Sequence, residues 1–183
     1  MTAGTIFTIG HSNHELDEFL ELVTGHGVDR VVDVRKLQGS RRYPQFDADA
    51  LQASLASIGV GFGRLEALTG RRPVSRTVPF EVNAWWQNRS FHNYADHALS
   101  PEFATALAEL RREGAARRTA VMCSEAVWWR CHRRIIADHL IAAGGTVRHV
   151  IGAGEAALAE LSGGAVIGPG GAVTYPGQGA PKQ

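Results

Sequence analysis

Apolar and polar positions follow two distinct patterns along the chain. Short continuous apolar runs, rich in β-branched residues, predict buried strands. Between them lie segments in which apolar residues recur every three or four positions, and this spacing predicts helices. The expected strands are residues 5–9, 31–34, 60–65, 119–122 and 146–151, and the expected helices are residues 16–23, 47–57, 101–113 and 130–143. Strands that alternate with helices predict a three-layer α/β domain, with helices on both faces of a mostly parallel sheet of about five strands.

Two segments depart from this alternation. Residues 66–100 contain two tryptophans, several arginines and little periodicity, so we expect an irregular insert of the kind that often carries function. Residues 162–183 are rich in Gly, Ala and Pro, and we expect a loose tail there with a short hairpin at 165–173. Residues 1–161, with the insert inside them, are expected to form a single domain.

The composition narrows the class of protein. Hydrophobic residues make up 44% of the 183 residues, which is enough for a packed core. The formal net charge of +1 creates no overall field, so any affinity for an acidic partner has to come from local patches. The first residues lack the pattern of a signal peptide, and no apolar run reaches the roughly 18 residues that span a bilayer. We therefore expect a cytoplasmic protein that does not engage a membrane.

Polar side chains follow three of the predicted strands. His11 and Ser12 follow the first strand, Asp33 and Arg35 the second, and Glu125 the fourth. Ligands of open parallel sheets bind at the carboxyl ends of the strands, so we expect the functional site at this edge. Asp33 and Glu125 are candidates for proton transfer, assisted by His11. Structural roles remain open for each: an ion pair between Asp33 and Arg35, a hydrogen-bonded histidine, a turn or cap at Ser12 and a counter-ion at Glu125.

A basic loop follows the second predicted strand. Residues 39–46 read GSRRYPQF and combine small residues with two arginines. Because arginine binds phosphate or carboxylate through paired hydrogen bonds, Ser40, Arg41 and Arg42 are expected to bind an anion together with Arg35 and Arg133. A solvated surface loop is the alternative.

The segment 121–134, VMCSEAVWWRCHRR, contains two cysteines, a glutamate, a histidine and three arginines close to two tryptophans. Cys131 falls at the expected start of a helix, where the helix dipole and the neighbouring basic residues favour the thiolate. Cys131 is therefore a candidate catalytic nucleophile, and a small buried side chain is the alternative. Neighbouring helical residues do not face each other, so we do not expect His132 to act as the base for Cys131 and assign it to ligand binding.

The tryptophans form two pairs near loops. Trp128 and Trp129 lie beside Cys131, and Trp85 and Trp86 lie in the insert. Trp128 and Trp129 are candidate stacking surfaces for a base or another flat ligand, and packing beneath a lid is the alternative.

No cofactor is predicted from these residues. A divalent metal remains an option through His11, Cys123, Glu125, Cys131 and His132. Their spacing matches neither a zinc ribbon nor an HExxH motif, so no metal ligand is assigned.

Three stretches together carry a family resemblance. TIGHSNHELDEFLELV, VVDVRKLQGSRRYPQF and VMCSEAVWWRCHRRIIADHL, followed by VRHV, resemble the bacterial family called domain of unknown function 488. The resemblance implies a Rossmann-like α/β domain and a cytoplasmic location, and it brings no settled activity. One departure is Leu68-Thr69-Gly70-Arg71, where such sequences usually have Leu-Gly-Gly ahead of Arg. The resemblance supports grouping His11, Ser12, Asp33, Arg35, Ser40, Arg41, Glu125, Cys131, His132 and Arg133.

Three functions are consistent with these features. The leading hypothesis is an enzyme that acts on a phosphate-bearing ligand, such as a nucleotide or nucleic acid, at the carboxyl edge of the sheet. The second is a cysteine-dependent thiol enzyme that uses Cys131. The third is a module that binds single-stranded nucleic acid without catalysis. The sequence predicts no oligomeric state.

Overall fold

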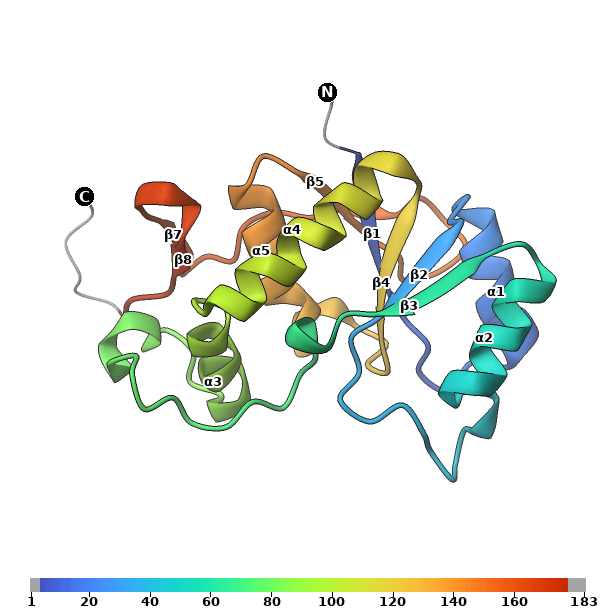
Figure 1. Cartoon of the computed structure of the whole chain (residues 1–183), viewed down its shortest axis with the longest axis horizontal. Helices are drawn as coiled ribbons and strands as arrows, with labels where there is room; N and C mark the ends of the chain where they lie inside the picture. Colours follow the sequence, from blue (N-terminus) through green and yellow to red (C-terminus); the bar gives the residue numbers. More distant parts are fainter. Residues whose placement is uncertain (1–3, 178–183) are drawn as a thin grey trace.

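The computed structural model describes residues 4–177 and shows a Rossmann-like α/β fold (Figure 1). The strands are β1 (Thr5–Gly10), β2 (Arg30–Asp33), β3 (Gly61–Arg64), β4 (Thr119–Cys123), β5 (Thr146–His149) and β6 (Ala157–Leu158). They form one sheet in the order β3-β2-β4-β1-β5-β6. The first five strands pair in parallel, which confirms the predicted sheet, and the two-residue β6 pairs antiparallel with β5.

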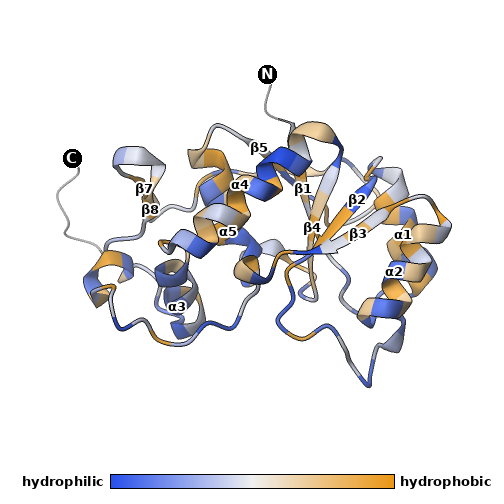
Figure 2. Cartoon of the chain, in the orientation of Figure 1, coloured by the Kyte–Doolittle hydropathy of each residue, from blue (hydrophilic) through white to orange (hydrophobic). Residues whose placement is uncertain are grey.

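Helices cover both faces of this sheet, as the alternation of elements predicts. Within residues 4–177 the α-helices are α1 (Leu16–Gly25), α2 (Ala48–Ser57), α3 (Arg89–His97), α4 (Pro101–Ala116) and α5 (Arg133–Ala142). Side chains of α1 and α2 pack into one core cluster, and those of α3, α4 and α5 pack into a second cluster. Hydrophobic positions recur along the elements that build both layers (Figure 2).

The alternation of side chains along β4 separates the two cores. Ala120 and Met122 belong to the cluster beneath α1 and α2. Val121 and Cys123 point the other way, into the cluster beneath α3, α4 and α5. Successive residues of a strand face opposite sides of a sheet, so a central strand buried on both sides reads as a continuous apolar run. This geometry also determines that Cys123 ends the strand on the α5 side.

The predicted irregular insert contains a helix that the sequence pattern does not reveal. Within residues 66–100, α3 begins after Asn88, whose side chain accepts hydrogen bonds from the backbone amides of Ser90 and Phe91. The buried positions of α3 are His92, Tyr94, Ala95 and Asp96, so its inward face is largely polar or aromatic. Such a helix lacks the aliphatic stripe on which periodicity depends.

The C-terminal segment is not a loose tail over its described part, residues 162–177. The expected hairpin is present, as β7 (Val166–Ile167) pairs with β8 (Val173–Thr174). Tyr175 is fully buried, and its hydroxyl donates a hydrogen bond of 2.7 Å to Asp138 in α5. The segment therefore packs onto the α5 side of the domain. The remaining residues of the predicted tail, 178–183, lie outside the described residues.

Within residues 4–177, no helix is both long and apolar enough to cross a bilayer.

Candidate functional site

A cleft of about 610 Å³ opens at the carboxyl ends of β1, β2 and β4. Its walls come from the loops after these three strands, from residues 70–71 of the insert and from the start of α3. This is the edge at which the sequence predicts a site. The cleft is lined by seven of the predicted site residues: His11, Ser12, Arg35, Ser40, Glu125, Cys131 and His132.

Six predicted site residues do not line this cleft. Asp33 and Arg133 are fully buried behind it. Arg41 and Arg42 are exposed on the basic loop. Trp128 stacks on His149 with ring centroids 4.3 Å apart and planes 7° apart, and Trp129 contacts Trp128 edge to face. Trp128 therefore packs beside the cleft, whereas Trp129 is 46% exposed and lies outside the cleft wall.

Asp33 acts as the counter-ion of Arg35. The Asp33 carboxylate accepts hydrogen bonds from the backbone amide of Arg35 at 2.9 Å, from Nε and Nη2 of Arg35 at 2.8–3.1 Å and from the Gln38 amide at 2.8 Å. Both groups are buried, so their charges are paired where an isolated charge would be costly. This arrangement favours the structural role of Asp33 over proton transfer.

His11 is held in one orientation by the same network. Nη1 of Arg35 lies 3.2 Å from Nε2 of His11 and can only donate, so Nε2 is the acceptor and Nδ1 carries the proton. Nδ1 donates to the Ser12 carbonyl at 2.9 Å. Burial, together with the positive charge of Arg35, lowers the pKa of His11 to about 4, although the Ser12 contact acts in the opposite direction. His11 is therefore neutral near pH 7 with both ring nitrogens engaged, which favours its structural alternative.

Two residues in the cleft wall have strained backbones. Ser12 has φ of 48° and Arg71 has φ of 56°, both in the left-handed region that side chains with a Cβ seldom adopt. Such strain persists only where the surrounding structure imposes it, and it clusters at functional sites. Within residues 4–177 these are the only non-glycine residues with positive φ, and both face the same cleft.

Cys131 lies at the boundary between the β4–α5 loop and α5. Residues 128–130 form a separate short 3₁₀ helix, and α5 begins at Arg133, so Cys131 precedes the helix rather than starting it. Nε of Arg133 donates to the Cys131 sulfur at 3.2 Å. Nη2 of Arg133 donates to the Glu125 carbonyl, which ties the loop to the helix. The local cation, more than the helix dipole, therefore stabilises charge on this sulfur.

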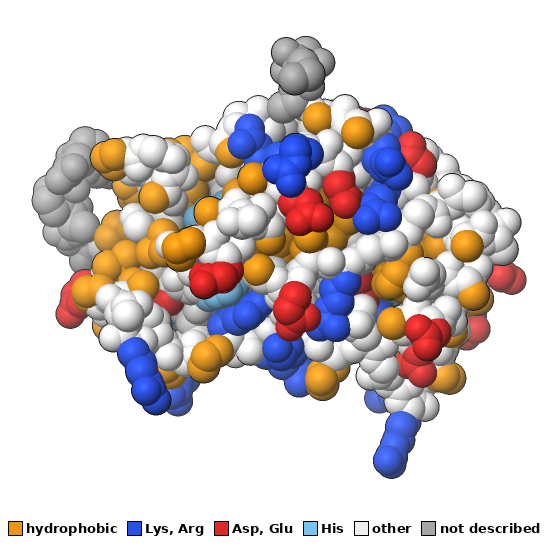
Figure 3. Space-filling view, viewed as in Figure 1, with side chains coloured by type: hydrophobic (Ala, Val, Ile, Leu, Met, Phe, Trp, Pro, Cys, Tyr) orange, Lys and Arg blue, Asp and Glu red, His pale blue; other side chains and the backbone are white. Residues whose placement is uncertain are grey.

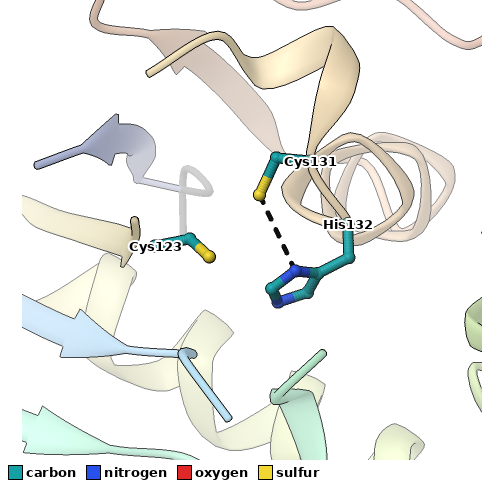
Figure 4. Close-up of side chains that lie close together, drawn as sticks. All are labelled: Cys123, Cys131 and His132. Atoms are coloured by element: carbon teal, nitrogen blue, oxygen red, sulfur yellow. Dashed lines mark hydrogen bonds between the residues drawn. The ribbon is translucent and has the colours of Figure 1, made fainter. Parts of the chain in front are cut away.

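Cys123 and His132 complete a compact group around Cys131 (Figure 4). The two sulfurs and one ring nitrogen of His132 all lie within 4.8 Å of one another. Nδ1 of His132 lies 3.7 Å from the Cys131 sulfur, and the Cys123 side chain points toward this pair. The two cysteines are not joined by a disulfide, and both line the cleft. The sequence left Cys123 unassigned, because its approach to Cys131 depends on the path of the loop between them.

The two thiols have opposite pKa shifts. Burial acts to raise the pKa of Cys131, but the hydrogen bond from Cys123 and the charge of Arg133 outweigh it and lower that pKa to about 6. The hydrogen bond to Cys131, together with burial, raises the pKa of Cys123 to about 12. The shifts therefore favour the negative charge on Cys131 and the proton on Cys123.

Cys123, Cys131 and His132 are also the described residues that could hold a soft metal such as zinc. The positively charged guanidinium of Arg133 lies beside the Cys131 sulfur, and several further cations line the cleft. A cation at this position would meet like charge, so the surroundings suit a thiolate better than a metal ion.

Glu125 and three cations line the cleft. The Glu125 carboxylate is exposed, and only its backbone carbonyl binds Arg133. Lys36 lies beside the basic loop that the sequence predicts to bind an anion, but the sequence assigns no ligand contact to Arg71 or Arg130. All three are exposed cleft residues. Arg71 could not be found from the sequence, because nothing there shows that the insert folds over the strand ends.

The comparisons with known proteins identify a family. The model of the family described as "Domain of unknown function DUF488" matches residues 15–140. This range includes the basic loop, the insert, both cysteines and most of α5. Comparison with curated proteins and with solved structures finds no match.

Proposed function

We propose a function from the site itself, because the chain belongs to the DUF488 family, whose description names no activity. The proposal is an enzyme in which the Cys131 thiolate attacks an anionic substrate held in the cleft at the strand ends. The observation that carries it is the position of the Cys131 sulfur in the cleft, 3.2 Å from the buried Arg133 guanidinium.

The electropositive surroundings of the Cys131 sulfur support its role as the nucleophile. A thiolate, not a thiol, is the reactive form of cysteine, and reactive cysteines occupy electropositive surroundings. Arg133 supplies a fixed positive charge because its side chain is fully buried and bonded to the Glu125 carbonyl. The lowered pKa of Cys131 is consistent with a thiolate at neutral pH. Burial alone would produce the opposite shift, so a purely structural cysteine does not account for this arrangement.

The cationic side chains that line the cleft support an anionic substrate. Arg71 and Arg130 are exposed and line the cleft, and Lys36 lines it while pairing with Glu66 at 3.3 Å. Arg35 is buried and paired with Asp33. Exposed guanidinium groups bind phosphate or carboxylate through paired charge-assisted hydrogen bonds. A phosphate-bearing ligand, such as a nucleotide or nucleic acid, is therefore the first substrate class to test.

A module that binds nucleic acid without catalysis is the less favoured alternative. Basic and acidic side chains are interspersed over the face shown in Figure 3, and the net charge is only +1. The tryptophans expected to stack on bases lie outside the cleft. Such a module would also give no reason for the charged environment of Cys131.

Competition between anions and a small alkylating reagent tests this proposal. We expect iodoacetamide to modify Cys131 rapidly, and inorganic phosphate or nucleoside phosphates to slow that modification. Arg71→Ala should weaken the protection about tenfold, which corresponds to the loss of one charge-assisted hydrogen bond. Arg41→Ala is the matched control, because Arg41 is exposed but does not line the cleft. Equal protection in both variants would contradict anion binding here, and slow alkylation of Cys131 would contradict the nucleophile.

A further inference from the structure

We infer that Cys123 is the second reacting thiol of this site and that the substrate is an anionic organic disulfide. This inference rests on the proposed role of Cys131 as the nucleophile. It assigns a catalytic role to Cys123, and it names the bond that the enzyme would break.

Both sulfurs lie in the same cleft. Cys123 ends β4, and Cys131 lies at the far end of the loop 124–130. Their sulfurs lie within 4.8 Å of each other, and a bond of about 2.05 Å requires only that two side chains and this loop adjust. A low-pKa cysteine beside a second thiol is the arrangement of a dithiol that exchanges disulfides.

His132 is placed to move the proton that the second step requires. Its ring contacts both cysteines, lying 3.7 Å from the Cys131 sulfur and lowering the pKa of Cys123 by its contact there. The ring packs against Tyr94 with centroids 4.8 Å apart, and a Cβ on Gly70 would lie 2.9 Å from Nδ1. These neighbours hold the imidazole beside the two sulfurs.

The first step consumes the Cys131 thiolate. Its sulfur attacks one sulfur of the substrate disulfide and forms a mixed disulfide, and the other half of the substrate leaves as a thiolate. The departing thiolate and the retained half carry acidic groups that Lys36, Arg71 and Arg130 would bind.

The second step begins because the first has removed a charge. The raised pKa of Cys123 arises first from its hydrogen bond to Cys131 and second from burial, with the Cys131 charge adding to both. Formation of the mixed disulfide removes the acceptor and the charge, so the pKa of Cys123 falls. Cys123 then gives its proton to His132 and attacks the Cys131 sulfur. The products are a Cys123–Cys131 disulfide and a second substrate thiolate, which takes up that proton.

The balance of the reaction is one disulfide reduced to two thiols and one protein dithiol oxidised to a disulfide. A further turnover requires a thiol reductant, either a dithiol or two equivalents of a monothiol. Exchange with that reductant returns Cys123 and Cys131 to the free cysteines of the structure.

Two disulfides of opposite charge test this inference on the full reduced chain. Glutathione disulfide carries carboxylates, and cystamine carries ammonium groups. Each protein is mixed with one of these disulfides, the reaction is stopped with acid, and the mass of the intact protein is measured by mass spectrometry. The wild type should lose two hydrogens and retain no adduct. Cys123→Ser should retain one glutathione on Cys131, and Cys131→Ser should stay unmodified. Cystamine should react more slowly than glutathione disulfide by about tenfold.

The outcomes separate the inference from the proposed function. A wild type that retains glutathione on Cys131 without an internal disulfide would overturn the role of Cys123 and leave the Cys131 nucleophile in place. Rapid alkylation of Cys131 without any reaction with glutathione disulfide would overturn the substrate class. Slow reaction of Cys131 with both reagents would remove the proposed function itself. Cys123→Ala serves as a second variant in case Cys123→Ser does not fold.

Discussion

At the scale of single residues, Arg133 connects Cys131 to the loop that follows β4. Its side chain is fully buried, donates to the Cys131 sulfur at 3.2 Å and binds the Glu125 carbonyl. A buried guanidinium remains charged, so it holds a permanent positive charge against the sulfur. The sequence placed Arg133 among the residues that bind a ligand, but the structure places it behind the cleft, in contact with Cys131. Arg133 is therefore a positioning residue.

Replacement of Arg133 by methionine tests this role. Methionine has a similar length and no charge, so Arg133→Met should raise the pKa of Cys131 toward its ordinary value. The rate of Cys131 alkylation at pH 7 should then fall by about tenfold. The rate at high pH, where the thiol is ionised in both proteins, should change little. Arg134→Met is the control, because Arg134 lies against the tryptophans, 5.1 Å from the ring of Trp86. An unchanged dependence of the rate on pH in Arg133→Met would show that Arg133 does not lower the pKa of Cys131.

At the scale of elements, two glycines allow the segments around the site to approach closely. A Cβ on Gly10 at the end of β1 would overlap the backbone carbonyl of Glu125. A Cβ on Gly70 in the insert would lie 2.9 Å from the His132 ring. The first neighbour is backbone and the second is a side chain, so the two sites differ in how easily the neighbour can move.

Alanine substitutions at these glycines should separate stability from reactivity. Gly10→Ala should lower the free energy of unfolding by about 1–3 kcal/mol, because the β4–α5 loop has to move, and it should also slow Cys131 alkylation. Gly70→Ala should cost less stability, since the ring can rotate, but it should displace His132. Urea unfolding measures the first effect. Gly25→Ala is the control, because a Cβ there meets nothing within 4 Å. Equal losses at Gly10 and Gly25 would contradict the close approach.

The elements also show how far the sequence could be read. The central strands β1, β2 and β4 follow from apolar runs, since a strand buried on both faces needs no partner to be recognised. The edge strand β3 has no fully buried residue, so its signal in the sequence is weaker. The helix α3 was missed because His92, Tyr94 and Asp96 face inward, and their burial depends on tertiary hydrogen bonds such as that from Asn83 to Asp96 at 2.7 Å. The strand-end rule located the cleft correctly. It could not distinguish a ligand-binding arginine from one paired beneath the surface, because that depends on partners distant in sequence.

At the scale of the whole molecule, buried histidines make the stability of the folded state depend on pH. Burial is the main cause that lowers the pKa of His11, His139 and His149 to about 4. In the unfolded chain a histidine titrates near 6.5, so between these values the unfolded state binds more protons than the folded state. Stability should therefore fall as the pH is lowered from about 6.5 to about 4.

Replacement of His139 isolates one part of this effect. His139 packs against Phe103, and among residues 4–177 its buried Nε2 has no hydrogen-bond partner. His139→Leu removes a group that takes up a proton on unfolding, so this variant should lose less stability than the wild type between pH 6.5 and pH 4. Thermal unfolding at a series of pH values, compared with pH 8, measures the difference. Parallel losses in the two proteins would show that another group governs the acid sensitivity.

The rate of Cys131 alkylation as a function of pH shows whether this cysteine is a thiolate at neutral pH. Wild-type protein is treated briefly with iodoacetamide at each pH, and modification of Cys131 and Cys123 is quantified separately by peptide mass spectrometry. We expect the Cys131 rate to rise to half its maximum near pH 6, with Cys123 unmodified at neutral pH. A Cys131 rate that rises only near the ordinary thiol pKa of about 8.5 would contradict the account.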